Sequence, residues 1–221
     1  MQSEIDAATV VWYHDRQLRE RDWPIMSHGP IPSCPSGVWE WIAANHRYNG
    51  LGQRERTRMG RLDVSPAEIG AGKRLAERYD QKRRDAQDAI DRALLAGLRD
   101  VACRPDARLS DDTAGAMVDR LSVLALQIGQ VRAQAHCTHA DADDVHAATG
   151  KLERLLAQRR DVMACLDALL AEARAGRAYF RCRPRTDGPD ALPGDTPPRV
   201  LRQEVPHYLA QGEERRRGAS V

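Results

Sequence analysis

Residues 65–97 read SPAEIGAGKRLAERYDQKRRDAQDAIDRALLAG, and this stretch decides the fold. Serine followed by proline is typical of a helix start, because serine caps the first free amides and proline is tolerated at the first helical position. Apolar or small residues then recur every three or four positions, at Ile69, Gly72, Ala76, Tyr79, Ala86, Ile90 and Leu94. This spacing keeps one face of a helix toward a core. The stretch therefore predicts a single amphipathic helix, about 50 Å long, that ends near Gly97.

The same periodicity predicts four more helices, over residues 4–20, 37–59, 112–136 and 142–178. Ser36, an aspartate at 111 or 112, and the aspartates of residues 141–144 are expected to cap three of them. In the first helix, the inward stripe is expected at Ile5, Ala8, Val11, Trp12, Asp15 and Leu18. No segment shows the alternation of apolar and polar residues that is typical of a β-strand. We expect an all-α bundle of four to five long helices over residues 1–180. A Pro/Gly/Arg-rich C-terminal extension over residues 181–221 is expected to pack on the bundle or on a partner.

Two arginines interrupt the apolar stripes of the predicted helices. Arg83 lies on the inward face of the helix over residues 66–97, and Arg159 lies on that of the last helix. The inward face of the helix over residues 37–59 also changes from apolar side chains to amides and a carboxylate. A guanidinium buried without a partner costs several kcal/mol, so these arginines imply internal carboxylates, a bound anion or water. The sequence thus indicates a polar chamber inside the bundle.

Three segments within residues 40–180 carry a recognisable pattern. They are Thr113-Ala-Gly-Ala-Met-Val-Asp-Arg-Leu-Ser, Lys73-Arg74 with Asp80-Gln-Lys-Arg-Arg-Asp, and the run from Leu152 through Gln158-Arg159 and Asp161 to Asp167 and Gly176. These segments resemble the bacterial family known as domain of unknown function 4254. The chain departs from the family pattern at Glu77, Asp80, Arg84 and Gln127, where the family has Asp, Asn, Asn and Lys. The family has no general assigned activity, so the resemblance supports the helical fold more than a function.

The strongest candidate site combines polar side chains from four predicted helices, because bundles build sites from residues on facing helices. The candidate catalytic residues are Glu55, His46, Asp85 and Asp119, and the candidate substrate-binding residues are Asn45, Asn49, Arg83, Arg120 and Arg159. Glu55 or His46 would act as the base, and the arginines would hold an anionic group. The alternative is a structural network in which Arg83 and Arg159 pair with Asp119 or Glu55 and fix the helix register.

Other candidates have simpler explanations. The segment with His136, Cys137, His139, Asp141, Asp143, Asp144 and His146 has ligand types that suit zinc. Its aspartates are explained by helix capping, however, and no metal is expected. His14 and Asp15 could form an acid–base pair, but neighbours on a helix point about 100° apart. Trp12, Trp23, Trp39 and Trp41 are read as core or lid packing.

The composition limits the class of protein. The formal net charge is only +2, which argues against a dedicated nucleic-acid binder. The five cysteines are odd in number and far apart, which is typical of a reduced cytoplasmic protein. No apolar run approaches the length needed to span a bilayer, so no membrane association is expected.

Two functions fit these features. The first is a cofactor-independent biosynthetic enzyme for a small anionic metabolite, in which elimination or intramolecular displacement expels a sulfate or phosphate group. The second is a non-catalytic helical subunit that binds and supports a partner enzyme. The long helices and the tail could also form a homodimer. The identity of the substrate is not specified by these residues.

Overall fold

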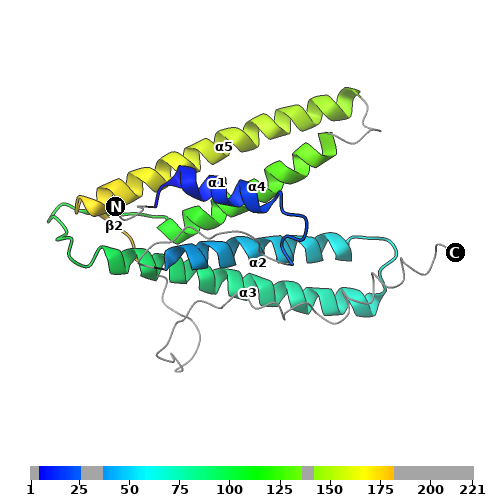
Figure 1. Cartoon of the computed structure of the whole chain (residues 1–221), viewed down its shortest axis with the longest axis horizontal. Coiled ribbons are helices and arrows are strands. Elements are labelled where there is room, and N and C mark those ends of the chain that lie inside the picture. Colours follow the sequence, from blue (N-terminus) through cyan, green and yellow to red (C-terminus); the bar gives the residue numbers. More distant parts are fainter. Residues whose placement is uncertain (1–4, 26–36, 136–141, 182–221) are drawn as a thin grey trace.

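The computed structural model describes residues 5–25, 37–135 and 142–181, and within them the fold is all-α (Figure 1). Its helices are α1 (Ala7–Gln17), α2 (Val38–Met59), α3 (Pro66–Gly97), α4 (Ala114–Ala135) and α5 (Ala142–Arg174). The sequence predicted no strand. The structure adds one short parallel pair, β1 (Arg108–Leu109) with β2 (Ala178–Tyr179). The expected packing of the tail lies outside the described residues.

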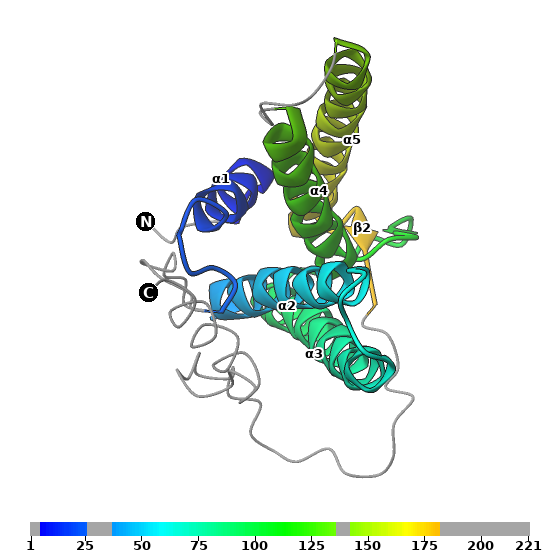
Figure 2. The same cartoon turned by 90° about the vertical axis from the view of Figure 1, so that its right-hand side faces the viewer.

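The helices form two hairpins, α2 with α3 and α4 with α5, and α1 packs on α4 and α5 (Figures 1 and 2). The predicted inward stripe of α3 is confirmed at Gly72, Ala76, Tyr79, Ala86 and Ile90, which are buried. The main core contains, among others, Ile42, Ile90, Leu121, Ile128, Val162 and Leu166. No helix in the described ranges is both long enough and apolar enough to cross a membrane.

The helix starts show which local signals the chain uses. Ser65 caps the start of α3, as the sequence predicted, and it also forms a full capping box with Glu68. The predicted cap of α2 at Ser36 is wrong, because the N-cap residue is Gly37, at a φ of 64° that favours glycine. Helix α4 begins two residues later than predicted, and the Thr113 hydroxyl accepts from the Ala116 amide over 3.1 Å.

The predicted inward stripe of α1 is wrong at Ala8 and Trp12, which are exposed, although Ile5 just before the helix is buried. The buried residues of the helix are Ala7, Val10, Tyr13, His14 and Gln17, whereas Trp12 is 53% exposed. Both registers repeat at helical spacing, and periodicity alone does not select between them. The structure selects the one that places Val10 and Tyr13 in the main core and His14 against α2.

Helix α5 ends at Arg174, before the predicted 178, because the chain turns there. Gly176 has a φ of 67°, and a Cβ at this position would lie 2.3 Å from the Ala102 carbonyl oxygen. Only glycine fits both the backbone conformation and the close approach. The turn leads into β2, which pairs with β1 and joins the end of α5 to the segment between α3 and α4.

Candidate functional site

Helix α2 is the central element of the fold. Its residues 42–52 are all buried, although they include amides, a histidine and an arginine. Buried polar groups are normally hydrogen-bonded, so the neighbours of these side chains decide what the interior can do. Arg47 is satisfied by backbone, because its Nε donates to the Pro24 carbonyl over 3.1 Å and its Nη2 donates to the Ile25 carbonyl over 3.2 Å. It thereby holds the segment after α1 against α2.

Asp119 of α4 is the centre of a polar network that reaches α2 and α3. Its Oδ1 accepts 2.9 Å hydrogen bonds from the side-chain amides of Asn45 and Asn49. Its Oδ2 accepts from Arg83 Nη1 over 2.5 Å. Asn49 also donates to the hydroxyl of Ser122, one turn further along α4, over 3.0 Å. The structure therefore brings together four of the predicted site residues.

His46 continues this network into a stack of rings. Its Nδ1 lies 2.8 Å from the Ser122 hydroxyl. Its ring is stacked on His14 at 4.3 Å and on Trp23 at 4.7 Å between centroids. Burial lowers the pKa of His46 to about 3, and the contact with the His14 backbone opposes this shift. Burial also lowers the pKa of His14 well below 6.5, with further contributions from His46 and Arg159. Both rings are neutral at physiological pH.

Both interrupting arginines have a carboxylate partner. Arg83 pairs with Asp119, and Arg159 Nη1 contacts both carboxylate oxygens of Asp15 at 3.0 Å. The exposed fractions of the two arginine side chains are 24% and 13%. The expected burial is thus largely confirmed. The suggested His14–Asp15 pair is wrong, because Asp15 faces α5 while His14 packs against α2.

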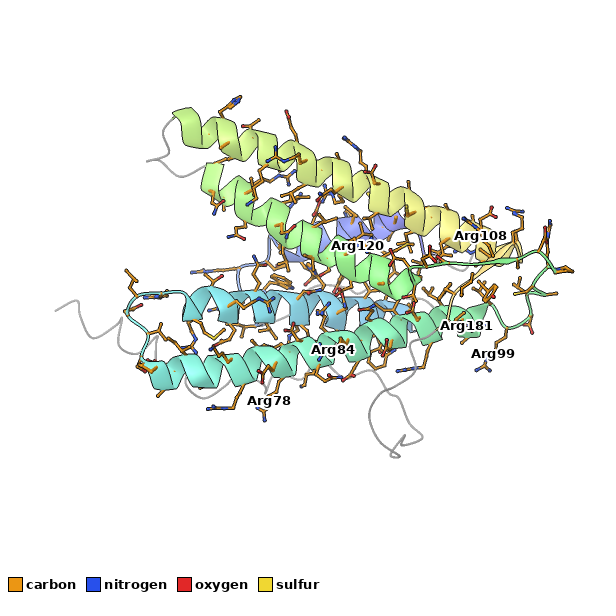
Figure 3. All side chains as sticks on the ribbon, turned by 180° about the vertical axis from the view of Figure 1, so that it is seen from behind. Arg78, Arg84, Arg99, Arg108, Arg120 and Arg181 are labelled. Atoms are coloured by element: carbon orange, nitrogen blue, oxygen red, sulfur yellow. The ribbon has the colours of Figure 1, made fainter. Side chains whose placement is uncertain are left out.

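The remaining predicted site residues do not join this network. Asp85 is exposed and accepts from Gln81 over 3.0 Å. Arg120 is 53% exposed and pairs with Asp112 at 3.2 Å, on the side of α4 that faces the viewer in Figure 3. Successive helical residues point about 100° apart, so Arg120 cannot share the environment of Asp119. The single chamber predicted from the sequence is therefore divided.

Glu55 belongs to a different place, a pocket beside the C-terminal half of α2. Its side chain is 6% exposed, and its Oε1 accepts from Arg58 Nε over 2.9 Å and from Arg58 Nη2 over 2.6 Å. A Cβ at Gly72 of α3 would lie 2.8 Å from the same oxygen, so the absence of a side chain there lets α3 approach the carboxylate. The pocket has a volume of about 260 Å³. Its lining is formed by Ile25, Leu51, Arg54, Glu55, Thr57, Arg58, Arg61 and Tyr79.

Sequence reasoning missed Arg54 and Arg61 as members of this pocket. Both are exposed and lie off the apolar stripe, so periodicity gave no signal for them. Arg54 lies on α2 next to Glu55, and Arg61 lies just after the end of α2. Tyr79 of α3 and Ile25 complete the pocket around them.

The four tryptophans have separate environments. Trp39 is buried in the core, Trp23 stacks on His46, Trp41 is partly buried, and Trp12 is exposed with the Arg16 guanidinium 5.4 Å from its ring centroid. Residues 136–141 of the suggested zinc segment, and the side chains of Asp143 and Asp144, lie outside the described part of the chain. Residues 26–36 also lie outside it.

The family model described as Protein of unknown function (DUF4254) matches residues 39–182. The chain belongs to this family. Comparison with curated proteins and with solved structures gives no match.

Three residues of the segments that resemble the family, Thr113, Gly115 and Asp167, hold helix starts in place. The Gly115 amide donates to the buried Asp91 carboxylate of α3 over 2.6 Å, and Thr113 caps α4. At the other end of the match, Asp167 accepts from the Ala7 amide over 2.8 Å and so holds the start of α1. These family residues therefore have structural roles in this chain.

Proposed function

We propose that this chain is a cofactor-independent enzyme for a small anionic metabolite that binds in the pocket beside Glu55. One observation carries the proposal. A buried carboxylate lies in the wall of a pocket whose other charged lining residues are guanidiniums, from Arg54, Arg58 and Arg61. An arginine fork binds phosphate, sulfate or carboxylate through two parallel hydrogen bonds. The pocket volume lies just below the ~300–1,000 Å³ that is typical of drug-sized ligands, which suits a small metabolite.

The arrangement supports an elimination. Arg58 keeps Glu55 in a fixed orientation, and the carboxylate can then accept a proton from a carbon of the substrate. The electron pair left by that proton forms a carbon–carbon double bond. The bond between the neighbouring carbon and its ester oxygen breaks, and the electron pair of that bond leaves with the phosphate or sulfate. Arg54 stabilises the charge that develops on this leaving group, whereas the fork of Arg61 already holds Asp63 at 3.0 and 2.8 Å.

The arginine clamp is revised from the one that the sequence predicted. Arg83 and Arg159 are each paired with an aspartate, and Arg120 lies on another face. Glu55 remains the proposed base. His46 is a poor second choice, because its ring lies fully buried between His14 and Trp23.

The test uses the purified full chain and two probes, a β-phosphooxy ketone and the matching β-sulfooxy ketone. Phosphorus NMR and ion chromatography measure the release of phosphate and sulfate. Calorimetry measures the binding of inorganic phosphate. We expect Arg54→Gln to weaken phosphate binding about ten-fold, which corresponds to the loss of one charge-assisted hydrogen bond. The control is Arg74→Gln, which removes an exposed arginine of α3 that does not line the pocket.

Glu55→Gln should abolish release of the leaving group while phosphate still binds. Because this change also weakens the contact with Arg58, Glu55→Asp is the second variant, and it keeps the charge but moves the carboxylate away from the substrate. Thermal unfolding of both variants separates loss of activity from loss of fold. Phosphate binding that is equal in the Arg54→Gln and Arg74→Gln variants would contradict the assignment of the pocket.

A second candidate function is a non-catalytic helical subunit. The ion pairs of Arg83 with Asp119 and of Arg159 with Asp15 favour this function, because both interior arginines then set the helix register. Under this function, inorganic phosphate would not bind beside Glu55, and variants of the pocket would differ from the unaltered chain in stability alone.

A further inference from the structure

A second concave site lies between α4 and α5, on the surface that bears Arg120. It is a groove of about 450 Å³. Its floor consists of the aliphatic side chains Val123, Leu124 and Val162. Its rim consists of Arg120 and Gln127 from α4 and of Gln158 and Asp161 from α5. The α4 positions are three, four and seven residues from Arg120, which places them on one face of that helix.

The rim combines both signs of charge with two amides. Arg120 pairs with Asp112 at 3.2 Å, which orients the guanidinium at one end of the groove. Within the described ranges, the side chains of Gln127, Gln158 and Asp161 are exposed and make no hydrogen bond or ion pair. Their donors and acceptors are therefore available to a molecule that lies on the aliphatic floor. A concave apolar surface with a few polar groups at its edge is the usual form of a small-molecule site.

The charges restrict the chemical class of that molecule. Asp161 repels a simple anion, and the N–H groups of Arg120 that Asp112 does not occupy can bind a carboxylate. A molecule that carries one carboxylate and one ammonium group satisfies both side chains. The floor of valine and leucine side chains adds a preference for an aliphatic side chain. The amides of Gln127 and Gln158 can each donate and accept, so they suit the same zwitterion.

We propose that the groove between α4 and α5 binds a zwitterionic amino acid with an aliphatic side chain. Its carboxylate lies at Arg120, its ammonium group lies at Asp161, and its side chain lies on Val123, Leu124 and Val162. This site is separate from the pocket beside Glu55, which shares none of its lining residues. A test of this site therefore does not depend on the enzyme activity proposed above.

The experiment is a titration of the full chain, labelled with carbon-13 at its leucine and valine methyl groups, followed by NMR. The probes are L-leucine, 4-methylpentanoate, which lacks the ammonium group, and isopentylamine, which lacks the carboxylate. We expect L-leucine to shift the methyl signals of Val123, Leu124 and Val162 saturably. Each analogue should bind about ten-fold more weakly, because it loses one charge-assisted contact.

Variants test the orientation of the ligand. Asp161→Asn should weaken the binding of L-leucine about ten-fold but leave that of 4-methylpentanoate unchanged or stronger. Arg120→Gln should weaken L-leucine and spare isopentylamine. Glu153→Gln and Arg132→Gln are matched controls, because both residues are exposed on α5 and α4 and neither lines the groove. The proposal is overturned if millimolar L-leucine leaves the three methyl signals in place, or if both analogues bind as tightly as L-leucine.

Discussion

The imidazole rings of His14 and His46 lie stacked in the interior, with centroids 4.3 Å apart and planes inclined by 24°. Both residues are fully buried, and neither nitrogen of His14 has a hydrogen-bond partner among the described residues. A proton on either ring would be desolvated and would face the other ring. The contact is therefore compatible only with two neutral histidines, which links the stability of α1 on α2 to pH.

The first prediction concerns this pH dependence. In the unfolded chain both histidines titrate near 6.5, whereas in the folded protein the pKa of His46 is about 3 and that of His14 is also lowered. Between these pH values the unfolded state binds more protons. The contribution of the two neutral histidines to the free energy of unfolding should therefore be fully present above pH 6.5. On acidification the free energy of unfolding should fall, by up to ~1.4 kcal/mol per pH unit for each histidine. Urea unfolding at several pH values measures this slope.

A matched pair of variants isolates the histidine contribution. His14→Phe keeps an aromatic ring in the stack but does not titrate, so the slope should become shallower whatever the change in absolute stability. His146→Asn removes an exposed histidine of α5 and should leave the slope unchanged. Equal slopes in the His14→Phe variant and the unaltered chain would show that His14 does not contribute to the acid sensitivity.

The second prediction concerns Asp119. Asp119→Asn keeps the shape of the side chain but removes the charge that Arg83 and two asparagines contact. We expect a loss of about 2–4 kcal/mol in the free energy of unfolding, since Arg83 loses its short ion pair and keeps only the longer contact with Asp80 at 3.7 Å. The comparison is Arg56→Gln, whose ion pair with Asp80 is long at 3.7 Å and exposed. That change should stay within about 0.5 kcal/mol.

The third prediction concerns the crossing of α3 and α4. A Cβ at Gly115 would lie 2.4 Å from the Gln87 carbonyl oxygen, which is backbone and cannot rotate away. Gly115→Ala should therefore lower the free energy of unfolding by at least about 1–3 kcal/mol. At Gly97, by contrast, nothing lies within 4 Å of the added carbon. Gly97→Ala should be neutral or stabilise by up to about 1 kcal/mol. Thermal denaturation of the two single variants decides the point, and similar melting temperatures would refute the close packing.

The fourth prediction concerns the contact of Trp23 with α2. A Cβ at Gly50 would lie 2.3 Å from Trp23 Cη2, so Gly50→Ala should push the indole off α2 and away from His46. Tryptophan emission should shift to the red as the ring becomes wetter. The same change in a Trp23→Phe background should leave the emission unaltered. Gly129→Ala is the control, because its added carbon meets only Leu18 at an ordinary 3.5 Å. An emission shift that persists without Trp23 would mean that another indole responds.

The sequence by itself determined the helices and most of their inward faces. Helical spacing and the Ser65-Pro66 start specified α3 to the residue, because capping and periodicity act within one or two turns of the chain. The same reasoning identified Arg83 and Arg159 as interior arginines that need partners. These inferences depend on interactions between residues a few positions apart.

Only the tertiary structure decided which partners those residues have. Asp15 is 144 positions from Arg159, and His14 and His46 lie on different helices, so no local pattern relates them. The register of α1 was settled by the surface on which it packs, because its sequence allows two stripes. The division of the predicted chamber into the Asp119 network, the Glu55 pocket and the Arg120 groove has the same origin. Neighbouring residues on a helix point about 100° apart, and the hairpins that receive them are placed by packing of the whole core.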